Sequence, residues 1–357
     1  MAKLGEYVNI KTGKLDANAS SENGKYPFFT CAIEPLKIDT YSYDCECVLV
    51  AGNGDLNVKY YSGKFDAYQR TYIIESCDKS KLYVPYMYYF LDKYVETLRK
   101  LSIGGVIKYI KLGNLTDSEI PIPELSIQKK IVFNLDKVTH TIDTCNAILE
   151  KLDLLVKSRF IEMFNTGEYT TVKLKSVCSK ITDGTHKTPN YLPEGITFIS
   201  AKNIINGELD FSDVKYISET EYNEIQKRCQ TEIHDILLSK SGSLGSPTIL
   251  RTDKPLGLFE SLAIIKYDRR IMLPEFLCEQ LKTDDIQRQF KIGTKGVAIK
   301  HLHLNVIGDI DVVVPPLALQ QQFADFVEQT DKSKLAVKQV LEKAQTLKKA
   351  LMQGYFG

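Results

Sequence analysis

Two stretches of the chain, 97–114 and 286–303, combine lysine and arginine with glycine and contain no acidic residue. Lysine and arginine neutralise phosphate charge, and glycine lets a backbone come close to a phosphate. One such stretch is usually a solvated surface, but here the pattern occurs at corresponding points of two similar halves of the chain. We therefore predict contact with nucleic acid. The residues concerned are Arg99, Lys100, Gly104, Gly105, Lys108, Lys291, Lys295 and Lys300.

Several polar, loop-like segments could add contacts to bases or phosphates. Arginine and lysine hydrogen-bond well to guanine, and asparagine and glutamine to adenine. Each of these residues, taken singly, fits a turn or a phosphate contact better than a base contact, so we predict a DNA-binding surface without assigning bases. Its further members are Lys59, Tyr61, Lys64, Gln69, Arg70, Asp183, Thr185, His186, Lys187, Lys202, Asn203, Ser239, Lys240 and Ser241.

No set of residues in the sequence predicts catalysis. The phosphate-binding pattern G-x-x-x-x-G-K-[S/T] is absent, and no glycine-rich dinucleotide-type loop follows a strand. Pro315-Pro316 follows three valines, unlike the Asn/Asp-Pro-Pro-aromatic pattern of amino-methyltransferases. His301 and His303 would share one face of a strand, but their basic surroundings favour DNA contact over a metal. We predict no catalytic residue, metal or cofactor on this chain, which would then not be an enzyme by itself.

Composition gives a near-neutral globular protein. Its 357 residues are long enough for two domains, and the net charge of +1 argues against a protein that holds DNA by electrostatics alone. Eight cysteines are scattered, with only Cys45 and Cys47 close together, so we expect free thiols. No run of about 18 apolar residues predicts a membrane span, and the first residues lack the apolar segment of a signal peptide. We expect a cytoplasmic protein.

The chain is a tandem duplication with a period near 190 residues. Ile120–Phe164 aligns without a gap with Val312–Phe356, which places Pro123 on Pro315 and Gln128 on Gln320. Upstream of each of these segments, Cys47–Gly54 parallels Asp235–Gly242. A repeat of this length is a duplicated domain and not a solenoid. Short β-type runs bounded by Asn-Gly, Asp-Gly and Ser-Gly turns predict that each globular segment is a mixed α+β domain.

Each copy ends in a long helical segment. Ser126 to about Met163 contains neither proline nor glycine and repeats apolar residues every three or four positions, which predicts a helix on the order of 55 Å long. The second helix, about Ala318–Met352, has a seam interrupted by Thr330 and Lys334, so we expect it to pair antiparallel with the first. Two ordinary core helices, one per domain, are the alternative. The surface for helix pairing or partner binding comprises Ile131, Leu135, Val138, Ile142, Leu149, Leu152, Phe323, Val327, Val337 and Leu341.

This organisation resembles the specificity subunits of type I restriction–modification enzymes. The motifs I-P-x-P-x-L-x-x-Q (Ile120–Gln128) and V-P-P-L-x-x-Q (Val314–Gln320) introduce the two helices as in that family. Asp235–Gly242 and Asp183-Gly184-Thr185-His186 resemble its recognition domains. The first copy departs from the pattern, with Val50–Gly54 where the second has the more typical Leu238–Gly242, so contacts carry over less securely to the first domain.

The resemblance implies an α+β fold with two target-recognition domains separated by two long antiparallel helices. Residues 1–112 and 168–304 would each bind one half of a split, asymmetric double-stranded DNA target, with 113–167 and 305–357 as helical spacers. The helices would set the distance between half-sites and dock two methyltransferase subunits that use S-adenosylmethionine, while motor/nuclease subunits would supply ATP- and Mg-dependent cleavage. The alternative is a non-catalytic coiled-coil scaffold with duplicated protein-binding domains.

Overall fold

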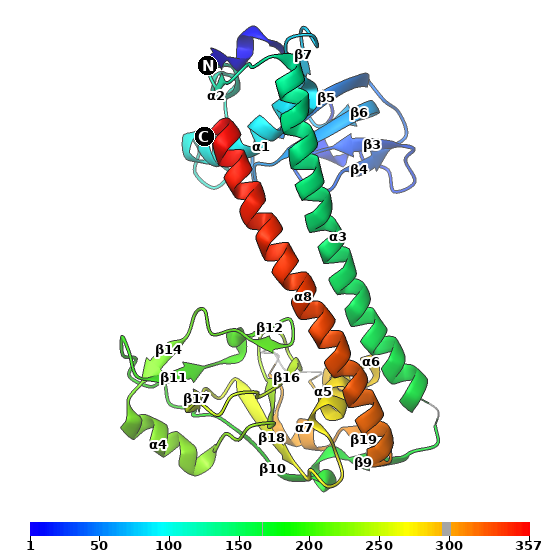
Figure 1. Ribbon diagram of the computed structural model, residues 1–357, viewed down its shortest axis with the longest axis vertical. Coiled ribbons are helices and arrows are strands. Elements are labelled where there is room, and N and C mark those ends of the chain that lie inside the picture. Colours follow the sequence, from blue (N-terminus) through cyan, green and yellow to red (C-terminus); the bar gives the residue numbers. More distant parts are fainter. Residues whose placement is uncertain (166, 295–300) are drawn as a thin grey trace. The chain divides into compact units, whose positions relative to one another are not determined.

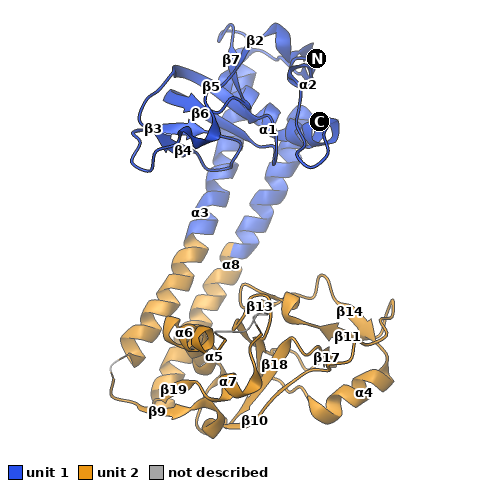
Figure 2. Cartoon of the chain, turned by 180° about the vertical axis from the view of Figure 1, so that it is seen from behind, with its two compact units in different colours: residues 1–147, 338–357 blue, residues 148–337 orange. Residues whose placement is uncertain are grey.

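The computed structural model describes residues 1–165, 167–294 and 301–357, and divides into two compact units (Figure 2). Unit 1 comprises residues 1–147 and 338–357, and unit 2 comprises residues 148–337. Two helices of 40 residues, α3 (Leu125–Phe164) and α8 (Leu317–Phe356), contribute one part to each unit (Figure 1). None of the described helices is long and apolar enough to cross a lipid bilayer.

Unit 1 is built on a six-stranded sheet in the order β2-β7-β5-β6-β3-β4. Neighbouring strands are antiparallel, except for the parallel pair β3 and β6. Helix α1 (Val84–Leu101) packs on β5 and β6, and its buried residues Tyr86, Phe90 and Leu98 recur at helical spacing. The strands are β2 (Val8–Thr12), β3 (Tyr26–Phe29), β4 (Leu36–Ile38), β5 (Tyr43–Ala51), β6 (Val58–Ala67) and β7 (Thr71–Ser76).

Unit 2 contains a four-stranded antiparallel sheet, β10-β18-β15-β16, and a three-stranded sheet, β14-β11-β17. A short hairpin, β12–β13, turns at Asn206 and Gly207, both with positive φ. The strands are β10 (Cys178–Asp183), β11 (Ile196–Ile199), β12 (Ile204–Ile205), β13 (Glu208–Leu209), β14 (Lys215–Ile217), β15 (Ile236–Ser239), β16 (Pro247–Ile249), β17 (Leu256–Leu258) and β18 (Leu262–Tyr267). The helices are α4 (Glu219–Arg228), α5 (Pro274–Lys282) and α6 (Asp284–Gly293).

The two units have the same structural frame, which is the same order of strand pairing, as the duplication predicts. Strand β5 pairs with β7 and β7 with β2 in unit 1, and β15 pairs with β18 and β18 with β10 in unit 2. A short helix and a two-stranded pair then precede each long helix. These elements are α2 (Leu112–Thr116), with β1 (Ala2–Lys3) and β8 (Glu119–Ile120), and α7 (Leu304–Gly308), with β9 (Thr170–Lys173) and β19 (Asp311–Val314).

Within each unit, the parts of α3 and α8 pack against each other. In unit 1 the Asn134 amide donates to the Tyr355 hydroxyl (3.3 Å). In unit 2 the rings of Phe160 and Phe323 lie 5.5 Å apart between centroids. The start of α3 therefore lies beside the end of α8 in unit 1, and the end of α3 beside the start of α8 in unit 2, so the helices are antiparallel. The predicted fold class is confirmed, and the predicted start of each helix is right to one residue.

The seam predicted on the helices is the inward face. Each of its members is buried or half-buried: Ile131, Leu135, Val138, Ile142, Leu149, Leu152, Phe323, Val327, Val337 and Leu341. The two polar interruptions in α8 are both satisfied. Thr330 donates to the carbonyl oxygen of Phe326 (2.9 Å), and the Lys334 ammonium lies 2.7 Å from the Asp153 carboxylate on α3.

Candidate nucleic-acid interface

In unit 1 the acid-free stretch forms a tight hairpin loop. The N–H groups of Ile103 and Tyr109 each donate to the other's carbonyl oxygen (3.0 and 2.9 Å). Gly104 has φ of +116°, and a Cβ on it would lie 2.6 Å from the Ile107 carbonyl oxygen. Only glycine fits this position without strain. The predicted glycine therefore has a structural reason, which is to let residues 103–109 turn back on themselves.

The hairpin is tied to the turn that follows β5. The Ile110 N–H donates to the Gly52 carbonyl oxygen (2.9 Å), and the Gly54 N–H donates to the Lys108 carbonyl oxygen (3.0 Å). Lys100 and Lys108 are exposed, and neither has an acidic partner among the residues that the structure describes. Arg99, by contrast, donates to the Leu56 carbonyl oxygen (2.8 Å) and lies 3.4 Å from Asp55. Lys100 and Lys108 are thus both available to an anion.

The other residues predicted for unit 1 differ in how accessible their side chains are to a ligand. Tyr61 packs its ring against Phe29 and Phe65. Burial lowers the pKa of the Lys59 ammonium, which donates to the Asn57 side chain.

Three predicted residues of unit 1 lie at the surface. Gln69 is exposed and donates to Asp16 (2.7 Å). Lys64 lies over the Tyr41 ring at 4.7 Å, and Arg70 is exposed. The surface available for DNA contact therefore includes Lys64 and Arg70 more readily than Lys59 or Tyr61.

In unit 2 a buried ion pair joins two of the predicted loops. The Asp183 carboxylate, at the end of β10, accepts hydrogen bonds from Lys240 and Arg228 and lies 3.3 Å from His186 Nε2. The side chains of Asp183 and Lys240 are only 2% and 3% exposed. Burial alone would raise the pKa of Asp183, but the hydrogen bond and charge of Lys240, with His186 and Arg228, hold that pKa below its usual value. Asp183 and Lys240 thus lie beneath the surface and position the loops.

A second layer of ionisable groups lies above this pair. Glu260 is 3.7 Å from His186 Nδ1 and 3.9 Å from His301 Nε2. Burial, with the charge of Lys240, lowers the pKa of His301. Sequence reasoning missed Arg228 and Glu260, because their partners Asp183 and His186 lie 45 and 74 residues away along the chain.

The turn after β15 corresponds to the turn after β5. The Leu302 N–H donates to the Lys240 carbonyl oxygen (2.9 Å), as Ile110 does to Gly52, and the glycines two residues after Lys240 and Gly52 have φ of +69° and +68°. The difference is at the side chain. A Cβ on Gly52 would lie 2.4 Å from the Arg70 carbonyl oxygen, whereas Lys240 has room to reach Asp183. The departure of the first copy from the family's pattern thus has a steric cause.

The remaining predicted residues of unit 2 divide in the same way. Asn203 is buried and holds its own loop, donating to the carbonyl oxygens of Asp210 and Asp213 (3.1 and 3.0 Å). Ser239 is buried as well, and Lys202 pairs with Asp213 (2.8 Å). The residues with exposed or half-exposed side chains are Thr185, His186, Lys187, Lys202, Ser241 and Lys291. Lys295 and Lys300 lie outside the described residues.

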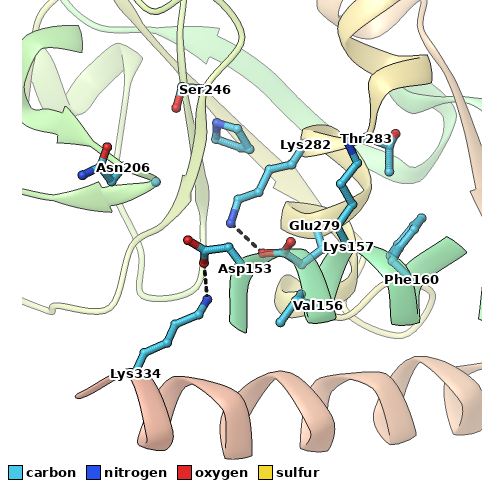
Figure 3. Close-up of a pocket in the computed structure, with 12 residues that line it drawn as sticks. Asp153, Val156, Lys157, Phe160, Asn206, Ser246, Glu279, Lys282, Thr283 and Lys334 are labelled. Carbon is cyan, nitrogen blue, oxygen red and sulfur yellow. Dashed lines mark hydrogen bonds and ion pairs between the residues drawn. The ribbon is translucent and has the colours of Figure 1, made fainter. Parts of the chain in front are cut away.

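A cavity of about 440 Å³ lies in unit 2 between α3, α5, α8 and the β12–β13 hairpin (Figure 3). The charged groups that line it pair with each other or with neighbours: Lys334 with Asp153, Lys282 with Glu279 (2.6 Å), and Lys157 with Asp284 (2.9 Å). Paired charges suit contacts between neighbouring helices better than the binding of a charged ligand. No group of three or more potential metal ligands occurs in the described parts of the chain.

The chain is similar to one protein family along most of its length. The family model described as "Type I restriction modification DNA specificity domain" matches residues 1–154 and 166–348. The EcoDI specificity subunit of Escherichia coli is 38% identical over 155 residues, which are 43% of this chain and 34% of that protein. A putative type I specificity subunit of Haemophilus influenzae, S.HindORF215P, is 23% identical over 91% of this chain and 86% of its own length. The matches to EcoDI and to EcoBI of Escherichia coli span 34% and 66% of those proteins, each less than two thirds.

Two solved structures share the fold. The S subunit of a type I restriction–modification system from M. genitalium superposes with a TM-score of 0.66 at 18% identity, covering 100% of this chain and 95% of that one. A chain from a structure of type I restriction–modification complex assembly and conformational transition gives 0.56 at 13% identity, covering 99% and 96%. At these identities the likeness shows the fold alone.

Proposed function

Because the chain belongs to the family of type I restriction modification DNA specificity domains, we propose that it is the DNA-specificity subunit of a type I restriction–modification complex. Each unit reads one half of a bipartite, asymmetric target. The chain is the non-catalytic member of the complex. Its recognition domains are residues 1–112 and 168–304, and its helical spacers are residues 113–167 and 305–357.

One observation carries the proposal: two units present different loops on the same hydrogen-bonded frame. Ile110 N–H to Gly52 and Leu302 N–H to Lys240 fix the corresponding turns. Around them, unit 1 presents Lys64, Arg70 and the 103–109 hairpin, and unit 2 presents Thr185, His186 and Lys187. Two similar frames with unlike side chains suit two half-sites of unlike sequence, because base edges are read by side-chain donors and acceptors.

The partners follow from the outward face of the helices. Phe133, Leu154 and Leu335 are exposed, although the seam between the helices is filled by other residues. Large apolar side chains that a partner covers lose their contact with water, and this favours binding of the partner. We propose that two methyltransferase subunits bind there, and that motor/nuclease subunits join them. S-adenosylmethionine, ATP and Mg²⁺ are then bound by these partners, in the cytoplasm, where the complex meets DNA.

The test is a genome-wide map of N6-methyladenine by single-molecule sequencing. Cells would express the chain alone, its candidate methyltransferase alone, or both proteins together. We expect one new bipartite motif only when both are present. A second map would use variants of the recognition surface. Replacing Lys64 and Arg70 by alanine should lower the methylated fraction of sites by weakening contacts to the half-site read by unit 1. Replacing Thr185 and Lys187 should lower it by weakening contacts to the half-site read by unit 2.

Co-purification of the two proteins is the control. If they associate and are soluble but no new motif appears, the proposal fails, and a scaffold with duplicated protein-binding domains explains the fold instead. If the motif is one continuous sequence and not two separated halves, the chain still determines which DNA sequence is methylated, but the assignment of one half-site to each unit is wrong.

A further inference from the structure

The tip of the 103–109 hairpin exposes apolar side chains. Val106 is fully exposed and Ile107 is 62% exposed, and Ile103 and Tyr109 at the base of the loop are also exposed. Leaving valine and isoleucine in water costs free energy in proportion to apolar area. Single exposed apolar residues are normal on a protein surface, but two adjacent ones at the end of a projecting turn form an apolar point.

The backbone holds this point in place. The reciprocal hydrogen bonds of Ile103 and Tyr109 close the loop, and the Gly54 N–H to Lys108 bond ties it to the turn after β5. Gly104 has φ of +116° and lies against the Ile107 carbonyl oxygen, so the turn at the tip is sharply defined. Val106 and Ile107 therefore need little ordering when they meet a partner, which lowers the entropic cost of binding.

In the sequence, lysines lie on both sides of the apolar tip. Lys100 and Lys108 are exposed without an acidic partner in the described part of the chain, and the stretch 97–114 contains no acidic residue. An apolar tip with unpaired lysines on either side in the sequence complements a partner whose surface is anionic and whose interior is apolar. The stacked bases of a DNA duplex between its phosphate strands are such a surface.

We propose that Val106 and Ile107 are a wedge that enters a base step of the DNA. The inference rests on the proposed function and adds a mechanism to it. The two side chains insert between neighbouring base pairs and partly unstack them, while Lys100 and Lys108 hold the adjacent phosphates. Unstacking costs free energy, which the inserted apolar area and the added contacts offset. Unit 1 then reads how readily that step opens, in addition to any base edges.

The experiment uses the full chain in complex with its methyltransferase subunits, bound to a duplex that carries the mapped motif. The adenine analogue 2-aminopurine, which brightens when it unstacks, replaces one base at a time at positions other than the methylated adenines. This choice separates a wedge from the movement of the target adenine during methylation. We expect a strong rise in fluorescence at one base step beside the half-site read by unit 1.

The test variant is the double substitution Val106→Ser/Ile107→Ser. We expect it to reduce that rise by at least about fivefold and to change affinity by less than about threefold, because the lost insertion is offset by the unstacking that no longer occurs. Ile33→Ser, at another exposed apolar residue of unit 1, is the matched control and should leave the fluorescence unchanged. Lys108→Ala should keep the rise and lower the slope of log affinity against log salt by about 1.

The outcomes separate this inference from the proposed function. A wild-type complex that binds and methylates the motif without unstacking any other base overturns the wedge alone. Loss of the methyltransferase from the Val106→Ser/Ile107→Ser complex also overturns it, because the tip is then a protein contact. Failure to obtain any motif overturns the proposed function and the wedge with it.

Discussion

The side-chain amides of Gln128 and Gln320 make the same three hydrogen bonds, one set in each unit. Gln128 donates to the carbonyl oxygens of Lys81 and Pro123 and accepts from the Tyr83 N–H, at 2.7 to 2.9 Å. Gln320 donates to Ile271 and Pro315 and accepts from Leu273, each at 2.8 Å. Both glutamines are fully buried in the first turn of their long helices. Each joins the start of a helix to the loop that precedes α1 or α5.

Replacing Gln320 by leucine should destabilise unit 2. The Leu273 N–H and the carbonyl oxygens of Ile271 and Pro315 would lose a buried partner, at a total cost of about 2–4 kcal/mol. Urea denaturation followed by circular dichroism measures the change. Gln321→Leu is the control, since Gln321 is exposed and donates to Asp325 on the same helix (2.8 Å). Equal stability of the two variants would show that the buried amide is not needed at this joint.

The pair Asp183 and Lys240 should show strong coupling. Lys240→Met leaves the buried Asp183 carboxylate without its main partner, and Asp183→Asn leaves the buried Lys240 ammonium without its partner. Breaking such a buried ion pair costs about 3–5 kcal/mol of unfolding free energy. The double variant removes both charges and should cost much less than the sum. A double-mutant cycle from denaturation midpoints gives the coupling, and additive effects would mean that the two charges do not stabilise each other. Lys187→Met, at an exposed lysine, is the control.

The same pair predicts a pH dependence. The folded pKa of Asp183 is lower than the unfolded value near 4. The stabilisation is therefore fully present above that unfolded value and is lost as the pH falls through the folded pKa. Asp183→Asn should be the less stable protein near neutrality, and the gap should narrow below about pH 4. Denaturation midpoints at pH 6 and pH 3 test this. Asp309→Asn, which removes an exposed partner of Lys175, should produce a much smaller gap.

Local periodicity accounts for what the sequence predicted well. The seam of α3 repeats over many turns, so both the helix and its inward face could be identified from the spacing of residues such as Leu135 and Leu149. The second helix continues to Phe356, beyond the predicted Met352, because Tyr355 and Phe356 pack on the core of unit 1, where the rings of Phe356 and Tyr86 lie 5.1 Å apart. Gly354 has no positive φ, unlike a helix-ending glycine.

Long-range pairing accounts for what the sequence could not predict. Asp183 and Lys240 lie 57 residues apart, and loop composition does not show that their side chains pair with each other below the surface. Lys334 appeared to weaken the helix seam, but Asp153 on the other helix satisfies it. In both cases the partner, and not the residue type, decides whether a charge lies at the surface or beneath it.

Phe323 should be the main aromatic anchor between α8 and unit 2. It is fully buried, and its ring lies 5.5 and 5.6 Å from those of Phe160 and Phe164. Phe323→Ala should cost about 3–5 kcal/mol of unfolding free energy, because it leaves a cavity in a packed core. Phe133→Ala, at a phenylalanine 57% exposed on α3, should change stability by less than about 0.5 kcal/mol. Phe133→Ala should instead weaken co-purification with the methyltransferase, and a stability loss as large as that of Phe323→Ala would place Phe133 in the core.

Gly104 and Gly105 are neighbours, but only Gly105 should tolerate substitution by alanine. Alanine at Gly104 would have to adopt φ of +116° with its Cβ 2.6 Å from the Ile107 carbonyl oxygen, whereas a Cβ on Gly105 would meet nothing within 4 Å. Gly104→Ala should therefore open the loop at a local cost of about 1–3 kcal/mol, and Gly105→Ala should leave it closed. Hydrogen exchange at the Ile103 and Tyr109 amides reports the loop directly, because those amides form its closing bonds. Faster exchange in Gly104→Ala alone is the expected result, and unchanged exchange would mean that the turn does not depend on glycine. In the DNA complex, Gly104→Ala should then lose the base-step signal together with the hairpin, since a wedge needs its tip held in place.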